Sequence, residues 1–318
     1  MIEVSIVIVC MNNLKNLYPC LNSIRKYTTV AYETFVVAYL FSKENLEKVK
    51  QDFPWVTFIE SNEIRGFSEN NNLALRQAKG KYCFVVNDDT EMKMSVIDRL
   101  VEDFSVLPEN VAIVSPKLIH SDGSDQVCGV PPISFKTVIL EKLHLWNRKK
   151  QIHFVNQTGL FKSYNIIGAA FLIKRDIFES VDWFDERYFF CPEDIALSTL
   201  LNNKGYACYV DGNAKIIHYE GMSGKSLSLI QTATKPAARR GSIIFLSKGN
   251  KTYAVCIEIV LTFFTIISFL IHCTQSLFSK RPNQFSILAL GEWNTIITSF
   301  SSKSPKEIFT QFYSKIKK

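Results

Sequence analysis

The segment Asn87-Asp88-Asp89 places two carboxylates and one amide directly after an apolar run that predicts a strand over residues 82–87. Side chains alternate along an extended chain, so Asn87 and Asp89 are expected to point to one side and Asp88 to the other. Their oxygens suit Mg²⁺ or Mn²⁺, which commonly bind one or two protein carboxylates and complete their coordination with phosphate and water. The competing interpretation is a helix cap, because Asp and Thr are good N-cap residues for a helix beginning near Met92.

A second acidic pair, Glu193-Asp194, follows Pro192 at the start of a predicted helix much later in the chain. The helix dipole favours a carboxylate in its anionic form there, and such a carboxylate can accept a proton from a bound ligand. Simple helix capping explains the pair equally well. His218 ends a short apolar stretch and is a further candidate, although a lone histidine in such a place is more often structural.

The elements that would position these residues alternate between strand-like and helix-like segments. This pattern predicts an α/β fold with a Rossmann-like, mostly parallel sheet and helices on both faces. Ligands of such sheets bind beyond the carboxyl ends of the strands, which is where the first acidic cluster lies. The predicted strands of the first half are 4–11, 33–40, 55–61 and 82–87, and the predicted helices are 14–26, 43–53, 70–79 and 95–106.

The second half is less regular in its pattern. Residues 116–165 contain glycines and prolines without a clear period, and we expect loops that shape an acceptor site. After them the pattern predicts a strand over 166–174, a short helix over 176–181 and a helix from 192 to about 204. Two short strands, 207–210 and 215–218, are expected around an Asp211-Gly212 turn.

Composition and charge place the chain among globular proteins. Hydrophobic residues make up 47% and charged residues 21% of its 318 residues, and the formal charge is +7. Residues 1–234 hold 25 Lys and Arg against 27 Asp and Glu, whereas residues 235–318 hold 12 against 3. The positive charge therefore lies next to the apolar C-terminal segments, which favours an anionic membrane surface over nucleic acid as a partner.

The C-terminal region contains an uncharged stretch, residues 259–279. As a helix it would be roughly 30 Å long, near the minimum for a membrane span. His272 and Gln275 interrupt it and basic residues flank both ends, so a helix in the membrane interface or a buried helix is favoured over a span. The eight cysteines form no Cys-x-x-Cys pair and the N-terminus predicts a strand rather than a signal peptide, which together indicate the cytoplasm.

Several segments, taken in order, resemble the inverting family 2 glycosyltransferases. Within that family the likeness is to bacterial rhamnosyltransferase-like enzymes of cell-surface polysaccharide synthesis, and it covers roughly residues 2–247. The segments that carry it are Val4 to Cys10, Asn62 to Phe67 with Asn70-Asn71-Asn72, Asn87 to Thr90, Gly168 to Arg175, Trp183 to Glu186 with Glu193-Asp194, and His218.

The resemblance implies a single GT-A domain, residues 1–247, followed by a basic and apolar helical region, residues 248–318. It implies transfer of a sugar from a nucleotide-diphosphate donor to the hydroxyl of a lipid-linked or oligosaccharide acceptor, at the inner face of the cell membrane. The expected metal ligands are Asp89 and His218, with Mg²⁺ or Mn²⁺. Asp194, beside Glu193, would be the catalytic base. The expected donor-binding residues are Asn12, Arg65, Gly66, Phe67, Asn71, Asn72, Asn87, Asp88, Arg239 and Arg240.

The sequence departs from the family pattern in three places. The family usually carries Asp-Asn-x-Ser after the second strand to hold the nucleotide base, whereas this chain reads Ala38 to Ser42 with no acid. The usual Tyr-Asn or His-Asn after the first strand is Met11-Asn12, and the charged residues that commonly follow Glu-Asp are replaced by Ala196 and Thr199. Base recognition is therefore expected to differ from that of the family.

Two other functions compete with glycosyl transfer. A nucleotidyltransferase would also use a metal and acidic residues, but its Gly-rich phosphate loop after the first strand is absent from this sequence. A catalytically inactive relative that binds a sugar nucleotide or holds a membrane assembly together is favoured by Ala38. Retention of Asp89, Asp194 and His218 favours the enzyme.

Overall fold

The computed structural model describes residues 2–147, 157–219, 229–279 and 281–316. These residues form two compact units. The first, the sheet unit, comprises residues 1–132, 147–185 and 193–222, and the second, the helical unit, comprises residues 133–146, 186–192 and 223–318. This boundary near residue 222 differs from the expected division at 247, because helix α8 (Ile230–Ser247) packs with the later helices of the helical unit.

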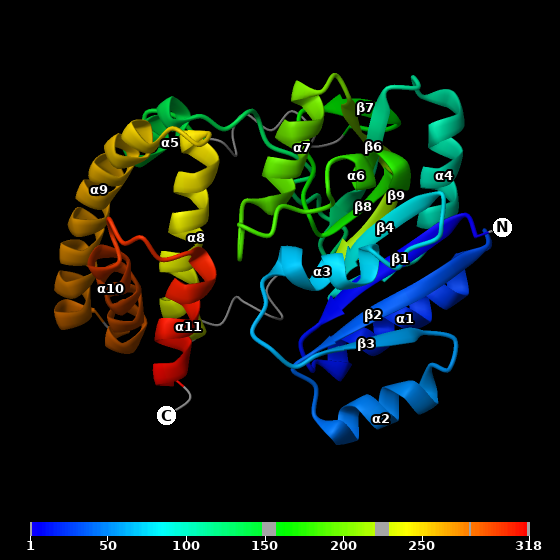
Figure 1. The fold of residues 1–318 in the computed structure, drawn as a ribbon, viewed down its shortest axis with the longest axis horizontal. Coiled ribbons are helices and arrows are strands. Elements are labelled where there is room, and N and C mark those ends of the chain that lie inside the picture. The colour runs from blue at the N-terminus through cyan, green and yellow to red at the C-terminus, as the bar shows by residue number, and fades with distance from the viewer. Residues whose placement is uncertain (1, 148–156, 220–228, 280, 317–318) are drawn as a thin grey trace. The chain divides into compact units, whose positions relative to one another are not determined.

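The first half of the sheet is parallel, as predicted. Strands β1 (Val4–Cys10), β2 (Tyr32–Tyr39), β3 (Thr57–Ser61) and β4 (Tyr82–Asn87) are arranged in the order β3-β2-β1-β4. The register between β1 and β4 runs from Val4↔Tyr82 to Val9↔Asn87, so both strands deliver their carboxyl ends to the same edge (Figure 1). The intervening helices are α1 (Leu14–Tyr27), α2 (Lys43–Asp52), α3 (Phe67–Leu75) and, after β4, α4 (Val96–Val106).

The second half of the sheet is mixed, which differs from the mostly parallel sheet expected. Strand β8 (Ala170–Lys174) is antiparallel to both β4 and β6 (Val111–Ile119), and β6 is parallel to β9 (Ala207–His218). Two short strands, β5 (Thr90–Met92) and β7 (Leu160–Ser163), are antiparallel to β9. The α/β fold is confirmed, with four parallel and four antiparallel pairings among the described strands.

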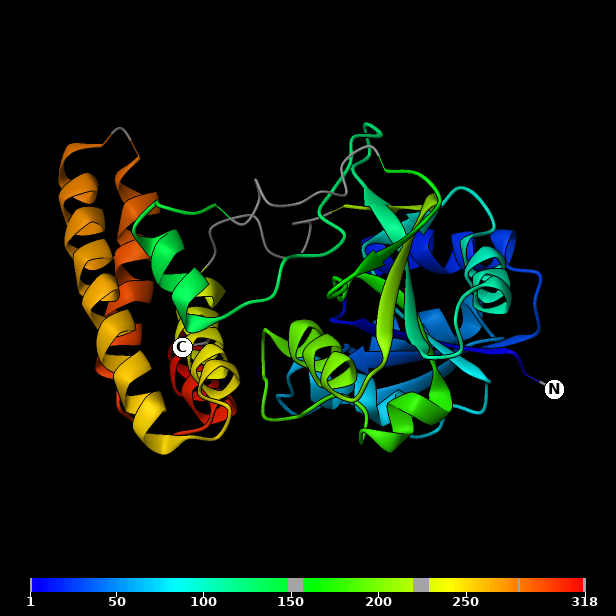
Figure 2. The same ribbon diagram turned by 90° about the horizontal axis from the view of Figure 1, so that it is seen from above.

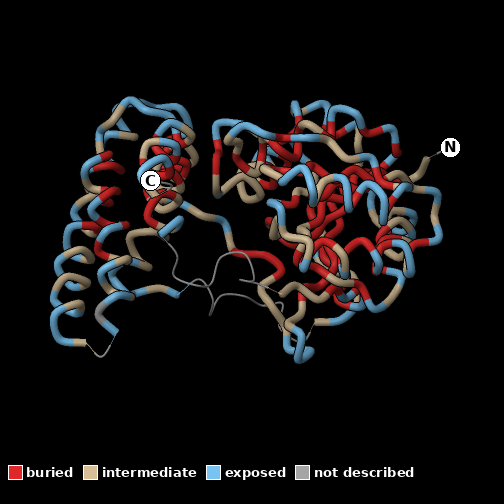
Figure 3. The backbone as a smooth tube through the Cα atoms, turned by 90° about the horizontal axis from the view of Figure 1, so that it is seen from below, coloured by how far each residue is buried: buried red, intermediate tan, exposed pale blue. Residues whose placement is uncertain are grey.

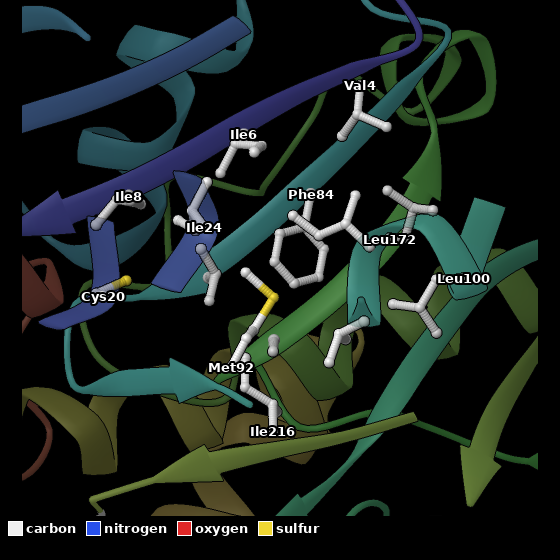
Figure 4. Packing of buried hydrophobic residues seen from close by; sticks show 14 of the residues in the cluster. Val4, Ile6, Ile8, Cys20, Ile24, Phe84, Met92, Leu100, Leu172 and Ile216 are labelled. Carbon is white, nitrogen blue, oxygen red and sulfur yellow. The ribbon is translucent and has the colours of Figure 1, made fainter. Parts of the chain in front are cut away.

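Helices cover both faces of the sheet, as expected. Two buried hydrophobic clusters lie on opposite faces, because successive residues of β1 alternate between them: Ile6 and Ile8 belong to one, and Val7 to the other. Helices α1, α2 and α4 contribute to the first cluster, which Figure 4 shows around Phe84, and α3, α6 (Arg175–Ser180) and α7 (Glu193–Asn203) contribute to the second. In Figure 3 buried residues follow the strands of the sheet unit.

Three local predictions were wrong. Helix α3 begins at Phe67 rather than residue 70, because the Glu69 carboxylate accepts a hydrogen bond from the Gly66 N–H and so caps the helix start. Residues 116–165 are not all loop, since they include part of β6, helix α5 (Phe135–Lys142) and β7. Strand β9 continues through Asp211-Gly212 as an irregularity in the register with β6, so no turn divides it.

The helical unit contains α5, α8, α9 (Lys251–Phe278), α10 (Pro282–Ile297) and α11 (Pro305–Ile316). Helices α9 and α10 run antiparallel beside each other, and both pack against α8 (Figures 1 and 2). Within the part of the chain that the structure describes, α9 alone is long and apolar enough to cross a membrane, with a mean hydropathy of 2.5 in its most apolar window and only 22% of that window buried.

Candidate active site

The acidic cluster forms the turn between β4 and β5 and does not cap a helix. Asn87 is the last residue of β4, Thr90 is the first residue of β5, and α4 begins only at Val96. The alternative of a helix cap at Asp88-Asp89 is therefore wrong. Because β5 pairs with the end of β9, with Thr90 opposite His218, the turn and the histidine are brought together across the sheet.

Asp89 and His218 lie side by side at this point. Asp89 Oδ1 is 3.4 Å from His218 Nε2, and the Asp89 side chain is only 5% exposed. The Tyr219 N–H donates to the Asp89 carbonyl oxygen over 2.9 Å and fixes the backbone of the turn. Two atoms that each lie about 2.1 Å from one ion can be at most about 4.2 Å apart, so one divalent cation could contact both.

Gln126 determines which nitrogen of His218 faces Asp89. Its Nε2 donates to the His218 carbonyl oxygen over 2.6 Å, which leaves its Oε1 to face His218 Nδ1 at 3.0 Å. An amide oxygen can only accept, so Nδ1 donates to Gln126, and Nε2 is the nitrogen that faces the Asp89 carboxylate. When Nε2 carries no proton, it and the Asp89 carboxylate are two acceptors that a cation between them would stabilise. This arrangement fits a bound divalent metal.

Gln126 was missed by the sequence analysis. It lies in the segment 116–165, which the pattern assigned to loops, and no motif distinguishes it from other glutamines. Its side chain also approaches His120, with Nε2 2.9 Å from His120 Nδ1. Only the folded chain reveals that this amide contacts a residue 92 positions away.

The protein supplies two candidate donors to this site, Asp89 and His218. Among the described residues there is no group of three or more His, Cys, Asp or Glu side chains arranged around a metal position. A pair consisting of one carboxylate and one imidazole is compatible with Mn²⁺ or Mg²⁺ if phosphate and water complete the coordination. The donor set therefore fits a metal that is held jointly with a nucleotide-diphosphate.

Asp88 interacts with other partners than Asp89 does, and because both residues lie in a turn, the alternation expected for an extended chain does not apply to them. Burial raises the pKa of Asp88 to about 6, and it interacts with the Cys10 thiol at the end of β1. Burial, followed by the charge of Asp88, raises the pKa of Cys10 well above its usual range. Asn87 contributes its backbone to the turn, because its carbonyl oxygen accepts the Thr90 hydroxyl over 2.8 Å.

Asp194 is held at the start of α7 by two backbone groups. Its Oδ2 accepts from the Gly168 N–H over 2.8 Å, and its Oδ1 accepts from the Ile195 N–H over 2.7 Å. Burial raises the pKa of this carboxyl, and the hydrogen bonds from Gly168 and Ile195 oppose that change. Glu193, the preceding residue, is half-buried at the first position of α7.

The backbone joins the two acidic groups. Gly168 donates to Asp194, and the carbonyl oxygen of the next residue, Ala169, accepts the Asn87 N–H over 2.9 Å. Only two adjacent residues before β8, Gly168 and Ala169, therefore separate Asp194 from the strand end that leads into the Asp88-Asp89 turn. A Cβ atom at Gly168 would lie 3.3 Å from the Asp194 Cβ, so the approach of the carboxylate depends on glycine at this position.

The Arg65-Gly66-Phe67 turn lies at the end of β3, on the parallel half of the sheet. The Arg65 N–H donates to the Tyr39 hydroxyl over 3.3 Å, and its guanidinium contacts the Ser61 hydroxyl at 3.2 Å and Glu63 at 2.8 Å. Phe67 begins α3 and packs edge-on against Phe184. Contact of this turn with a donor stays a prediction.

The predicted asparagines are engaged within the sheet unit. Asn12, in a left-handed conformation with φ of 52°, accepts from the Ser42 N–H and from Asn45, and so ties the end of β1 to the start of α2. Asn71 donates to the Phe67 carbonyl oxygen, and Asn72 exchanges two hydrogen bonds with the backbone of Phe184. A direct role of Asn12, Asn71 and Asn72 at the donor also stays a prediction.

Arg239 and Arg240 belong to the helical unit. Both guanidinium groups contact Glu258 of α9, at 3.5 Å and 3.4 Å, and Arg239 also donates to the Thr265 hydroxyl over 3.1 Å. Burial lowers the pKa of Arg239 to about 10. Their predicted approach to the diphosphate is not tested by these contacts, which show a structural ion-pair network between α8 and α9.

The chain is similar to known proteins in sequence and in fold. The family model described as glycosyl transferase family 2 matches residues 5–182. The O-antigen biosynthesis protein RfbC of Myxococcus xanthus is 26% identical over 195 residues, which cover 61% of this chain and 14% of that protein. The chain thus spans about a seventh of the length of the curated relative that it matches.

Two solved structures share the fold. GalNAc-T7 with UDP, GalNAc and Mn²⁺ is similar with a TM-score of 0.54 at 19% identity, over 72% of this chain and 46% of that chain. The mannosyltransferase PcManGT from Pyrobaculum calidifontis, in complex with GDP-Man and Mn²⁺, has a TM-score of 0.54 at 14% identity, over 98% of this chain and 84% of that chain. At these identities the likeness establishes the fold alone.

Proposed function

The chain belongs to glycosyl transferase family 2, and we propose that it moves a sugar from a nucleotide-diphosphate donor to an acceptor hydroxyl with inversion at the anomeric carbon. The observation that carries this proposal is the backbone connection between the two acidic groups, through Gly168 and Ala169 to Asn87. This connection supports a site in which Asp194, as proton acceptor, lies near the turn that carries the candidate metal ligand Asp89. Single-displacement transfer requires both groups at one substrate.

Asp194 is the proposed base. As the acceptor oxygen bonds to the anomeric carbon, its proton passes to the Asp194 carboxylate and the bond from that carbon to the diphosphate breaks. The pKa of Asp194 is raised by burial, which makes it a better proton acceptor near neutral pH than an exposed aspartate. The Gly168 and Ile195 N–H groups hold the carboxylate in place.

Asp89 and His218 are the proposed metal ligands, with Asn87 or Asp88 assisting. A bound Mg²⁺ or Mn²⁺ would neutralise the charge that develops on the leaving diphosphate. Gln126 keeps Nε2 of His218 directed at the site, and burial limits competition from water at Asp89. Both structural neighbours were solved with a nucleotide or nucleotide sugar and Mn²⁺, which supports this choice of cofactor.

We further propose that the reaction serves synthesis of a bacterial cell-surface polysaccharide, on a lipid-linked or oligosaccharide acceptor at the inner face of the cell membrane. The similarity to an O-antigen biosynthesis protein supports this setting. Rhamnose is the donor sugar favoured by the sequence resemblance. The nucleotide base must be recognised without an acid at Ala38, whose side chain is buried in β2.

The experiment that tests the proposal is a screen of the purified protein against nucleotide sugars, read by thermal shift with and without Mn²⁺. A donor that binds the native state raises the midpoint of thermal unfolding. The stabilisation grows with the logarithm of the ratio of the donor concentration to its dissociation constant. The donors that bind are then assayed for transfer, and the anomeric configuration of the product is read by NMR. Binding without any transfer would favour the inactive, scaffold-like function, and a retained configuration would contradict the mechanism.

A further inference from the structure

Helices α9 and α10 bury several polar side chains in the interior of the helical unit. Six of these polar residues are less than 9% exposed. A helix on the surface of a water-soluble protein shows the opposite pattern, with apolar residues inside and polar residues outside. The buried polar residues are Glu258 and Thr265 on α9, Glu292, Asn294 and Thr295 on α10, and Thr298 at its end.

Hydrogen bonds and ion pairs join these buried polar residues to one another and to α8. The Thr262 hydroxyl donates to the Ser299 hydroxyl over 3.0 Å and joins α9 to the end of α10. On α8, Arg239 donates to Thr265 over 3.1 Å and Lys235 pairs with Glu292. These polar residues therefore connect α8, α9 and α10 to one another. They lie on the buried side of the α9–α10 hairpin and do not contribute to its exposed side.

The side of the α9–α10 hairpin that faces away from α8 is apolar and exposed. We call it the apolar face. Phe263 is 60% exposed, Leu270 58% and Trp293 47%, values that a soluble protein rarely combines in one continuous surface. Its residues are Val255, Ile259, Phe263, Ile266, Leu270 and Leu277 on α9, and Leu290, Trp293 and Ile297 on α10.

We propose that the apolar face is a lipid-binding surface, which lies in the interface of an anionic bilayer with its side chains at the boundary of the acyl chains. Exposed basic residues flank the two helices: Lys248 and Lys251 lie before and at the start of α9, Arg281 lies before α10, and Lys303 lies after it. Acidic lipid headgroups attract such residues, and an amphipathic Trp293 suits the same depth. A second protein copy would not explain the flanking basic residues.

The hairpin lies along the membrane surface and does not enter it end-on. Arg281 lies in the short connection between α9 and α10, so an inserted hairpin would carry this charge into the hydrocarbon region at a large cost. Lys248 and Lys251 lie at the other end of α9. Helix α10 has 16 residues and is roughly 24 Å long, shorter than the hydrocarbon core of about 30 Å, so it could not return across the bilayer beside α9. Helix axes parallel to the surface keep both basic ends among the headgroups of one leaflet.

This inference specifies the membrane partner proposed above, and it is tested without donor or acceptor, so its failure leaves the transfer reaction unaffected. The first measurement is flotation of the full chain with vesicles of phosphatidylglycerol and phosphatidylcholine. We expect binding that weakens with salt and falls at least tenfold in the F263E/I266E variant. The control V106E adds a charge at an exposed site of the sheet unit, 74% exposed, and should bind as the wild type does.

The second measurement does not depend on how well the charged variant folds. Trp293 fluorescence should be quenched by lipids brominated near the headgroup end of the acyl chain, and Trp293→Phe should remove that quenching while flotation persists. The proposal is overturned if the wild type does not float with anionic vesicles, or if bromines at the chain termini quench most strongly, as a spanning helix requires. It is also overturned if light scattering shows a dimer that F263E/I266E dissociates and no vesicle binding occurs.

Discussion

The amide of Gln126 holds both the backbone and the ring of His218, with Nε2 2.6 Å from the carbonyl oxygen and Oε1 3.0 Å from Nδ1. The two contacts together fix the orientation of the amide and of the ring. His218 Nε2 is thereby directed at Asp89, 3.4 Å away. The histidine that a sequence motif can only suggest as a ligand is oriented for that role by a residue outside the motif.

Gln126→Ala is expected to raise the Mn²⁺ concentration required for half-maximal activity by about ten- to a hundred-fold, because residues that orient a metal-binding histidine typically contribute that much. Mn²⁺ titration of activity and of the thermal midpoint should show the same shift. Gln126→Glu, which still accepts from Nδ1–H, should recover part of the affinity. Gln77→Ala removes an exposed amide that donates to the Leu73 carbonyl oxygen, and it should leave the titration unchanged.

Asp194→Asn is expected to lower kcat by about a hundred-fold or more, because general-base catalysis typically contributes about a hundred- to ten-thousand-fold to the rate. Binding of the nucleotide sugar, measured by thermal shift, should remain. The matched control is Asp176→Asn, because Asp176 also accepts an adjacent backbone N–H, from Ile177, in the first turn of a helix. Full activity of the Asp194 variant would show that another group accepts the proton.

Gly168→Ala is expected to reduce kcat by up to about ten-fold through displacement of the base, because the added Cβ requires a shift of a fraction of an ångström and a misplacement of about 1 Å can cost a hundred-fold. The added Cβ would lie 3.3 Å from Asp194 Cβ and 3.4 Å from Oδ2, closer than comfortable packing. The backbone N–H is retained, so a loss would report on position and not on the hydrogen bond. Gly205→Ala, at a φ of 88° with open space around it, is a control for a destabilising change away from the site.

Asp103→Asn is expected to stabilise the protein at alkaline pH. Burial, and then the neighbouring Asp211, raise the pKa of Asp103 to about 7. In the unfolded chain an aspartate ionises near pH 3.9, so between these values the native state binds more protons and the free energy of unfolding falls as pH rises. The stability advantage of the variant over the wild type should grow by about 2–3 kcal/mol from pH 5 to pH 8.

Urea unfolding at pH 5 and pH 8 measures this difference. Glu102→Gln is the matched control, because Glu102 is exposed on the same helix and no advantage that grows with pH is expected for it. Arg99, which pairs with Asp211, remains in both variants. An advantage that is equal at the two pH values would indicate that Asp103 is ionised in the native state throughout the range.

The sequence by itself determined the regular part of the sheet unit. Apolar β-branched runs predicted β1, β2 and β4 to within one or two residues, because the local apolar pattern and the polar turn residues at each end indicate where such strands begin and end. Strand β6 was missed, since its proline and lysine break the apolar pattern while its neighbours β8 and β9, distant in sequence, supply the pairing. Pairing with distant strands is not visible in a local pattern.

The candidate site divides in the same way. Residue type and order were enough to nominate Asp89, Asp194 and His218, because few side chains can bind a divalent metal or accept a proton. Only the tertiary structure decided that Asp88-Asp89 is a turn and not a helix cap, that Gln126 orients His218, and that Gly168 makes room for Asp194. It also decided that the apolar residues of α9 face outward, since a hydrophobic sequence does not reveal which side of a helix its neighbours cover.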